Sequence, residues 1–385
     1  MKLHTVFPLL IAVACSSSSN GAAPPANDAS DEAPAADAGS ADAEDAAGSY
    51  AEAVLSATWK AVPGAPTVTG GAKQDDVVFP SASVGYAVSG PASTIYKTTN
   101  GGTTWKSVFT HTGTYFRSLL FIDESHGFAS NLGPIAQSTI TDTNVLYETM
   151  DGGASWNPVT AITGPMPTGI CNQTMIDPLH LVAVGRVEGP SFLMMSGDGG
   201  GTWTSTDLSS QLQMLIDARF TSPTDGIVVG GSAGSTMYCS ILHTTNGGGT
   251  WQPVFQSATP SSLCWKISFP SSLVGYVSVQ DTAGGTSSFA KTIDGGLSWK
   301  EMPLENAGTG YAGIGMGFIT EDIGWISADD VSAPTLRTTD GGQTWAKDSA
   351  LMSPINRFRF LSPTTAFAIG ATIWRLDVPW TGGEP

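Results

Sequence analysis

The most constraining feature of the sequence is a nonapeptide that recurs six times along one stretch of the chain. Its last copy reads RTTDGGQTW at residues 337–345, and every copy ends on a tryptophan. Successive tryptophans are 51, 47, 48, 48 and 46 residues apart, a period that suits a four-stranded propeller blade. These tryptophans are Trp105, Trp156, Trp203, Trp251, Trp299 and Trp345.

A second pattern runs in phase with the first. Six phenylalanines each stand six residues before a glycine or alanine, as Phe79 does before Gly85 and Phe360 before Ala366. The stretches that follow, such as GYAVS, GIVVGG and AFAIG, are rich in β-branched and aromatic residues and bounded by Gly and Ser. Such stretches are typical of strands. Seven of them, counting LVAVG, predict seven blades.

The seventh unit lacks a nonapeptide, because TIWRLDVPW is followed by no Asp-Gly-Gly turn. ATWKAVPG resembles the end of the repeat, and its Trp59 precedes Trp105 by 46 residues. We therefore expect the strand around Trp59 to complete the last blade and close the ring, which protects its edges. The predicted fold is an all-β, seven-bladed β-propeller of four-stranded blades over residues 57–380, with a tail at 381–385.

Each nonapeptide fits the pattern Ser/Thr-x-Asp/Asn-x-Gly-x-Ser/Thr-Trp, which we place in the turn between the third and fourth strands. Asp and Asn side chains accept hydrogen bonds from N–H groups in tight turns, and glycine supplies conformations that side chains forbid. Because either Asp or Asn occurs at this position, the turn needs an acceptor and not a charge, so a catalytic or calcium-binding array is disfavoured. The acceptors are Asn100, Asp151, Asp198, Asn246, Asp294 and Asp340.

The chain begins with MKLHTVFPLLIAVAC, in which Lys2 precedes an apolar stretch too short to span a bilayer. Small residues stand directly before Cys15, which resembles a bacterial lipobox. The resemblance implies a signal peptide at 1–14, lipidation of Cys15, and an exported lipoprotein of the outer membrane or cell surface. The alternative is an ordinary secretory peptide with a chance cysteine. Residues 15–56, which are acidic and rich in Ala and Pro, are predicted to be a disordered tether.

The formal net charge of the chain is −17, from 16 Lys and Arg against 33 Asp and Glu. This balance disfavours binding to nucleic acid or to an anionic membrane surface. We expect contact with the membrane through the lipid anchor only.

Three cysteines follow Cys15. Cys239 and Cys264 begin predicted strands on the same face of adjacent blades, so we predict a disulfide between them. Cys171 is then free and buried. The histidines lack the paired spacing of a zinc site, and no glycine-rich stretch opens a helix that cradles phosphate, so neither a metal nor a cofactor is expected.

The repeat resembles the Asp-box, or bacterial neuraminidase repeat, over nearly all of residues 57–380. Its arrangement, with F-x5-G followed by T-x-D-G-G-x-[TS]-W in almost every blade, is most similar to the photosystem II stability and assembly factor-like family. That resemblance implies a chaperone-like scaffold that binds a partner polypeptide and performs no catalysis. The chain departs from the family because it is acidic where the assembly factors have a basic patch. The partner is therefore expected to be an envelope protein or peptide, or else a glycan.

Enzymatic alternatives stay open at this level. A sialidase needs three arginines for the substrate carboxylate, and Arg117, Arg219 and Arg357 lie on predicted first strands. A glycosidase needs two carboxylates across a cleft, for which Asp75 or Asp76 and Asp217 are candidates. A third alternative is a glycan-binding module without catalysis.

We expect a ligand on the face formed by the loops from fourth to first and from second to third strands, opposite the nonapeptide turns. Exposed aromatic and guanidinium groups are typical binding hot spots. The long loop from Asn131 to Leu146 lies on the same face. The alternative is that Tyr and Trp plug the channel and Arg pairs with neighbouring acids. The candidate residues are Tyr115, Arg117, Trp265, Lys266, Tyr311, Asn356 and Arg357.

Overall fold

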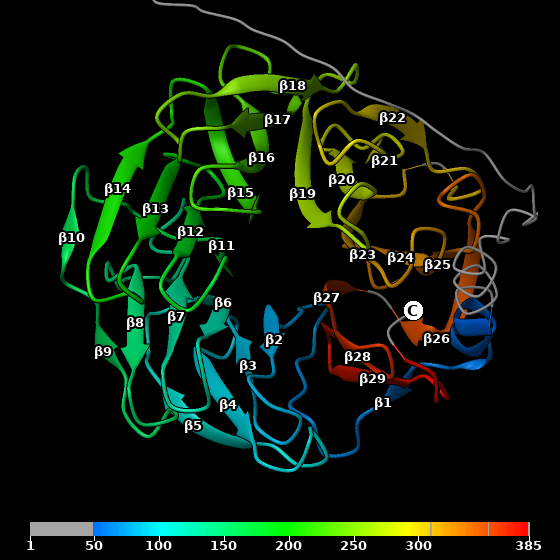
Figure 1. The fold of residues 1–385 in the computed structure, drawn as a ribbon, viewed down its shortest axis with the longest axis horizontal. Helices are drawn as coiled ribbons and strands as arrows, with labels where there is room; N and C mark the ends of the chain where they lie inside the picture. Colours follow the sequence, from blue (N-terminus) through cyan, green and yellow to red (C-terminus); the bar gives the residue numbers. More distant parts are fainter. Residues whose placement is uncertain (1–48, 137, 309, 353, 384–385) are drawn as a thin grey trace, which may run out of the picture.

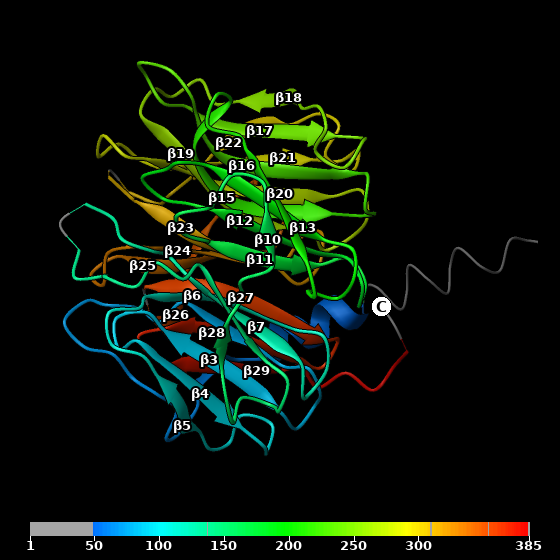
Figure 2. The same ribbon diagram turned by 90° about the vertical axis from the view of Figure 1, so that its left-hand side faces the viewer.

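Seven sheets stand like blades around a central axis in the computed structural model, which describes residues 49–383 except 137, 309 and 353 (Figures 1 and 2). The predicted all-β, seven-bladed propeller is confirmed. The first strand of every blade lies nearest the axis and contacts the first strand of the next blade. These inner strands are β2 (Asp76–Val78), β6 (Phe116–Phe121), β11 (Asn172–Met175), β15 (Leu212–Phe220), β19 (Ser262–Ser268), β23 (Gly313–Phe318) and β27 (Ile355–Ser362).

Buried second and third strands form the middle of each blade. The second strands are the short apolar stretches that the sequence predicts, and most of them are buried along their whole length. They are β3 (Gly85–Ser89), β7 (Gly127–Asn131), β12 (Leu181–Gly185), β16 (Gly226–Ser232), β20 (Gly275–Asp281), β24 (Gly324–Ala328) and β28 (Thr365–Gly370). The third strands are β4 (Thr94–Thr98), β8 (Leu146–Thr149), β13 (Phe192–Ser196), β17 (Cys239–Thr244), β21 (Ser288–Thr292), β25 (Pro334–Thr338) and β29 (Ile373–Asp377).

The fourth strands form the outer rim of the ring. Blade 3 departs from the predicted four strands, because β10 (Ile162–Thr163) pairs in parallel with its fourth strand and adds a fifth. The chain passes this edge on its way from blade 2 to blade 3. The fourth strands are β5 (Lys106–Thr110), β9 (Asn157–Pro158), β14 (Trp203–Asp207), β18 (Gln252–Gln256), β22 (Lys300–Pro303), β26 (Ala346–Met352) and, for blade 7, β1 (Lys60–Ala61).

The strand β1 closes the ring as predicted. It pairs antiparallel with β29, so that Lys60 lies opposite Arg375. Trp59 directly before it is buried, at 3% exposure, against Trp325 and Phe358. Blade 7 is therefore built from both ends of the described chain.

A short helix at residues 49–56 precedes β1 and corrects the predicted boundary of the tether at residue 56. Tyr50 and Val54, one helical turn apart, are 3% and 2% exposed and pack in the same core cluster as Trp59. The helix therefore belongs to the propeller. The rest of the tether, the signal peptide and Cys15 lie outside the described residues. No helix of the described part of the chain has the length and hydropathy needed to cross a membrane.

The phenylalanine that precedes each second strand has a packing role. In blade 1 the ring of Phe79 lies against the backbone of Gly85, where an added Cβ would stand 2.5 Å from the ring. Phe79 also meets Trp105 edge-on, at 5.9 Å between ring centroids. The small residue six positions later is thus required for the phenylalanine to reach the tryptophan of its own blade.

The six nonapeptides form the predicted turns between third and fourth strands. In blade 2 the carboxylate of Asp151 accepts hydrogen bonds from the backbone N–H and the hydroxyl of Ser155. In blade 1 Asn100 accepts from the N–H of Thr104 but donates its amide to the Thr104 hydroxyl. A hydroxyl both donates and accepts, so Asp and Asn serve equally well.

The turns differ in their expected response to acid. Hydrogen bonds from Ser155 hold the pKa of Asp151 at about 2, and similar bonds hold the pKa of Asp198 and Asp294 at about 2. A lowered pKa stabilises the turn above the unfolded value of about 3.9, and this contribution is lost as the pH falls towards 2. We expect the amide of Ser155 to lose hydrogen-exchange protection between pH 4 and 2, as measured by NMR. The Asn100 turn is the internal control.

In that control turn, the amide of Thr104 should keep its protection over the same range, after correction for the intrinsic exchange rate. Equal losses at Ser155 and Thr104 would show that acid opens the blades as a whole and would contradict a local effect of the carboxylates.

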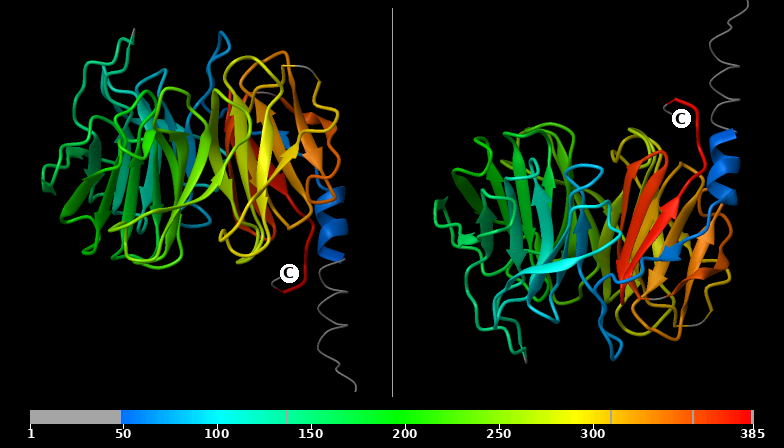
Figure 3. Two further views of the ribbon diagram at one scale, coloured as in Figure 1. Left: turned by 90° about the horizontal axis from the view of Figure 1, so that it is seen from above. Right: turned by 90° about the horizontal axis from the view of Figure 1, so that it is seen from below.

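The two faces of the ring differ in their loops and in the termini they carry. We call the face with the nonapeptide turns the turn face and the opposite one the loop face. The helix at 49–56 and the C-terminal end lie at the turn face, whereas the long loop between β7 and β8 rises from the loop face (Figure 3). The inner strands begin at the loop face and end at the turn face.

Candidate functional site

A hollow of about 370 Å³ opens on the loop face over the axis of the ring. Three of the predicted binding residues, Tyr115, Arg117 and Trp265, lie in its wall although they come from blades 2 and 5. We call this space the axial hollow. Its other lining residues are Gly71, Ala72, Lys73, Pro91, Leu132, Val187 and Asp329.

The two aromatic side chains of the axial hollow are fixed by their surroundings. The ring of Tyr115 lies on the backbone of Gly90, where an added Cβ would come within 2.1 Å of it. Trp265 donates its indole N–H to Oε1 of Gln280 at 2.6 Å. Both side chains stay partly exposed, so each presents an aromatic surface to the hollow from a defined position.

Bulges in the inner strands place several of these residues. The pairing register shifts between Phe116 and Ser118, which leaves Arg117 outside the ladder. The same irregularity occurs between Cys264 and Ile267 and between Ile355 and Arg357. A bulge re-aims the side chain of its extra residue. Sequence periodicity does not reveal bulges, which is why the orientations of these side chains were not predictable.

Below the axial hollow lies a layer of charged side chains, and its first ion pair joins blades 1 and 2. The guanidinium of Arg117 pairs with the carboxylate of Asp75, whose other oxygen accepts the N–H of Gly90 at 3.0 Å. Burial lowers the pKa of Arg117, but Asp75 outweighs burial and raises it. Arg117 is therefore a fixed cation at the floor of the hollow.

Asp76 forms the second ion pair, with 0% of its side chain exposed. Arg359 binds both carboxylate oxygens, at 2.8 Å each. The same oxygens accept the N–H of Val77 and, across the blade interface, the N–H of Leu119. Burial raises the pKa of Asp76, but Arg359 and Arg357 outweigh it and the pKa is lowered. Asp76 thus satisfies an edge N–H of the neighbouring inner strand.

Asp217 has the corresponding role between blades 4 and 5. Its carboxylate accepts the N–H of Ala218 at 2.9 Å and of Ile267 at 3.2 Å, and it also accepts the amide of Asn172. With its oxygens so occupied and 3% exposure, it has no access to a substrate. The candidates for a glycosidase pair, Asp75 or Asp76 with Asp217, are therefore all buried and hydrogen-bonded within the ring.

Lys266 and Arg357 correct the prediction that they are exposed. They are 3% and 6% exposed and lie in the charged layer, not on the loop face. Burial, followed by the nearby Arg357 and Arg117, lowers the pKa of Lys266 well below its usual range. Arg357 approaches Asp76 only to 3.5 Å, through its Nε. Its neighbour Asn356 is buried as well and donates to the carbonyl oxygen of Asp75.

Tyr311 is a further correction. It is 4% exposed, and its hydroxyl donates to the carbonyl oxygens of Ile326 and Pro334 at 3.1 and 2.9 Å. Burial accordingly raises its pKa. It belongs to the core between blades 5 and 6, together with Met316. From the sequence, a tyrosine in a loop before an inner strand can be either a binding residue or a core residue, and its position does not tell which.

The three arginines proposed for a sialidase do not converge. Arg219 lies over the ring of Phe269 in the next blade, with its guanidinium carbon 4.0 Å from the centroid. Arg117 and Arg357 are directed to Asp75 and Asp76. A substrate carboxylate therefore has no triad of arginines to bind.

Sequence reasoning missed Arg186, which lies in the loop after β12. Its guanidinium donates to the carbonyl oxygens of Gly189, Leu132 and Thr168, and so ties the long loop of blade 2 to blade 3. Leu132 in turn lines the axial hollow. The only sequence feature that could have indicated this role is the position of the arginine, after a buried strand and shortly before a Gly-Pro pair.

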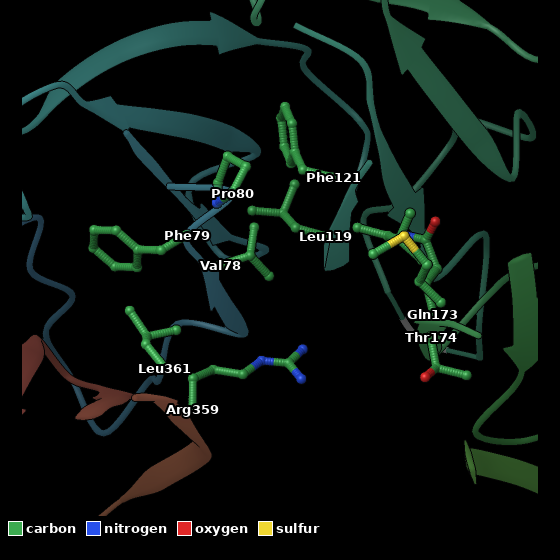
Figure 4. Close-up of a pocket in the computed structure, with 11 residues that line it drawn as sticks. Val78, Phe79, Pro80, Leu119, Phe121, Gln173, Thr174, Arg359 and Leu361 are labelled. Carbon is green, nitrogen blue, oxygen red and sulfur yellow. The ribbon is translucent and has the colours of Figure 1, made fainter. Parts of the chain in front are cut away.

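A second hollow, of about 240 Å³, lies at the turn-face end of the inner strands (Figure 4). Val78, Leu119 and Phe121 give it an apolar wall, and Arg359 extends into it from β27. The charged layer thus separates two hollows along the axis.

Cys239 and Cys264 are joined by a disulfide between blades 4 and 5, with their Cα atoms 4.7 Å apart. Cys171 is a buried free thiol. The described residues contain no group of three or more His, Cys, Asp or Glu side chains placed to hold a metal ion.

Comparison with known proteins shows likeness of fold. No protein-family model matches the sequence, and no curated protein matches it. Among solved structures, that of YCF48 bound to D1 peptide has 19% identity and a TM-score of 0.60, covering 84% of this chain and 97% of that one. YCF48 from Cyanidioschyzon merolae has 16% identity and a TM-score of 0.60, covering 84% of this chain and 99% of that one.

A third similar structure is the GH74 xyloglucanase from Xanthomonas campestris, at 13% identity and a TM-score of 0.57. It covers 86% of this chain, but this chain covers 55% of the xyloglucanase. The similar propellers therefore include both a peptide-bound protein and an enzyme, and the fold does not choose between them.

Proposed function

We propose that this protein is a lipid-anchored propeller of the cell envelope that binds a partner polypeptide in the axial hollow and performs no catalysis. The observation that carries the proposal is the wall of that hollow, where Tyr115 and Trp265 are held partly exposed above the fixed cation Arg117. Aromatic and arginine side chains in a concave site are the typical anchors of protein interfaces.

The resemblance of the nonapeptides to Asp-boxes and the likeness of fold to YCF48 bound to D1 peptide support a polypeptide as the partner. The acidic composition of this chain, unlike the basic patch of the assembly factors, affects which kind of partner it can bind. Both cations of the hollow, Arg117 and Lys73, are paired with acids, so this site offers aromatic contact beside paired charges and not a broad basic patch. The partner is expected to insert a side chain or chain end from the loop face.

The proposed anchoring at Cys15 is consistent with where the described part of the chain begins. The first described residues lie at the turn face, opposite the axial hollow. A lipid on Cys15 would hold the ring by its turn face and leave the hollow accessible. This agrees with an exported lipoprotein of the outer membrane or cell surface.

The proposal that the protein performs no catalysis is based on the burial of its axial carboxylates. Within the described residues, the three carboxylates of the charged layer are buried and hydrogen-bonded, and Lys73 pairs with the rim carboxylate Asp329. General acid–base catalysis needs a carboxyl group within reach of the reacting atoms. A glycoside hydrolase or a glycan-binding module is the alternative that the following experiment separates.

Trp265→Ala should weaken capture of the partner at least about tenfold, because it removes the aromatic anchor of the hollow. The measurement is recovery of cross-linked polypeptides from native membranes with tagged full-length protein. Leu297→Ala, an exposed residue of the turn face, is the matched control and should retain wild-type recovery. Unchanged thermal unfolding of Trp265→Ala shows that its fold is intact.

Two results would contradict the proposal. One is equal recovery with wild type and Trp265→Ala, which would place the partner elsewhere. The other is the recovery of no stoichiometric polypeptide at all. In that case glycan-binding and glycosidase assays with the same variants test the two alternatives.

A further inference from the structure

The exposed charges of the loop face are negative. Among the described connections between strands on this face, the only lysine and arginine are Lys73 and Arg186. Arg186 is 8% exposed and donates to backbone carbonyl oxygens, whereas Lys73 pairs with Asp329. Neither cation is therefore free to bind an anion. The same connections carry four exposed acids, which are Glu188, Glu305, Asp329 and Asp330.

Several cations of the ring lie at the opposite face. Lys97, Lys291 and Arg375 lie on third strands, where each is placed over an aromatic ring. Each also donates to a glycine carbonyl oxygen in the nonapeptide turn of the next blade. The turn face thus holds cations among its acids, whereas the loop face offers acids alone. This separation is a feature of the fold and does not follow from the acidic composition of the chain.

Three of the exposed acids border the axial hollow. Asp329 lines it, Asp330 follows Asp329 in the chain, and Glu188 follows the lining residue Val187. We call Glu188, Asp329 and Asp330 the rim acids. They belong to blades 3 and 6, so negative charge borders the hollow from two separate blades.

Lys73 shows which kind of side chain the hollow accepts. It lies in the connection from β1 to β2, lines the hollow and pairs with Asp329 of blade 6. The side chain of Lys73 is 18% exposed and that of Asp329 is 51% exposed, so the carboxylate stays accessible to a second cation. Ion pairs with this degree of exposure are weak, which allows an incoming cation to share or replace the contact.

The aromatic walls of the hollow suit the same chemistry. Lysine and arginine bind favourably over the faces of tryptophan and tyrosine rings. Tyr115 and Trp265 are partly exposed and held in fixed positions, so their rings are available for such contact. Arg117 at the floor does not oppose a cation, because Asp75 neutralises it. An acidic side chain would instead meet the rim acids and find Arg117 already paired.

We propose that the partner segment that enters the axial hollow is basic, with a lysine or arginine side chain against Tyr115 and Trp265 and its charge beside the rim acids. This inference rests on the proposed function and specifies the chemistry of the polypeptide that binds. Complementary charge steers the encounter of two molecules and is screened by salt, so binding should weaken as the salt concentration rises.

The test uses three dye-labelled peptides and the full chain. The basic probe is acetyl-Gly-Arg-Leu-Lys-Gly-amide, and the other two carry glutamate or glutamine in place of both basic residues. Fluorescence anisotropy measures binding at about 50 and about 500 mM NaCl. We expect the basic probe to bind saturably, at least about tenfold more tightly than the glutamate probe, and to lose affinity at the higher salt concentration.

Variants assign the binding to the hollow. Asp329→Asn/Asp330→Asn should raise the Kd of the basic probe at least about fivefold, and Trp265→Ala should raise it by a similar factor. Glu321→Gln/Asp322→Asn removes two consecutive exposed acids from the turn face of the same blade and is the matched control. It should bind the basic probe like wild type.

The inference is overturned if the basic probe does not bind saturably, if the glutamate or glutamine probe binds as tightly, or if the rim and control variants bind alike. Recovery of a polypeptide from native membranes separates this result from the proposed function. Recovery that is lost in Trp265→Ala but kept in Asp329→Asn/Asp330→Asn would overturn the basic chemistry alone. If the wild type recovers no polypeptide, the proposed function itself fails.

Discussion

Trp59→Ala is expected to lower the free energy of unfolding by about 3–5 kcal/mol, the usual cost of truncating a buried tryptophan. Its ring is 3% exposed and meets Trp325 and Phe358 edge-on, at 5.4 and 5.8 Å between centroids. The substitution leaves a cavity at the point where the N-terminal strand joins the last blade. Urea denaturation followed by circular dichroism measures the effect.

The control for this prediction is Leu55→Ala in the helix just before β1. Leu55 is 43% exposed, so its truncation should change stability by less than about 1 kcal/mol. A Trp59→Ala variant within 1 kcal/mol of wild type would mean that the N-terminal segment adds little to ring closure.

Asp76→Asn should cost about 3–5 kcal/mol, because it removes the carboxylate from a buried ion pair and leaves the arginines behind. Arg359 would lose its bidentate partner, and Arg357 would lose its nearest negative charge. An amide offers only one oxygen where the carboxylate accepts from Arg359, Val77 and Leu119. Urea denaturation of both proteins gives the difference.

The pH dependence of that difference separates charge from packing. The pKa of Asp76 is lowered in the folded protein, so its contribution is present above the unfolded value of about 3.9 and is lost as the pH falls through the folded value. The two proteins should therefore differ equally from pH 8 to 5 and converge only below about pH 4. Asp377→Asn removes an exposed carboxylate whose partner Arg375 keeps its bond to the carbonyl oxygen of Gly101, so it should cost less than about 1 kcal/mol. A constant difference down to pH 2 would contradict the ionic origin.

The fold was predictable because its elements repeat. The nonapeptide identifies the same turn six times, and the geometry of that turn depends on local residues such as Asp151 and Ser155. Closure by the segment around Trp59 followed from the same period. Local hydrogen bonds and periodic burial are the two kinds of information that a single sequence carries well.

The candidate site was predictable only in part. Tyr115, Arg117 and Trp265 were placed on one face because each was expected just before or in the first part of an inner strand, and all three line the axial hollow. Lys266 and Tyr311 occupy similar positions in the repeat yet are buried. The difference arises from bulges and from packing between blades, and neither leaves a periodic signal. The helix at 49–56 was missed because only Tyr50 and Val54 mark its buried face.

The pairing of β1 with β29 has a consequence for the order in which the molecule is made. Lys60 is among the first residues of the domain to leave the ribosome, and its partner Arg375 is among the last. No nascent chain shorter than the whole domain can therefore complete blade 7. Until then Trp59 lacks Phe358, and the edge of the first-made segment is unpaired and open to other chains. The ring therefore stays open during synthesis until its final strand has been made.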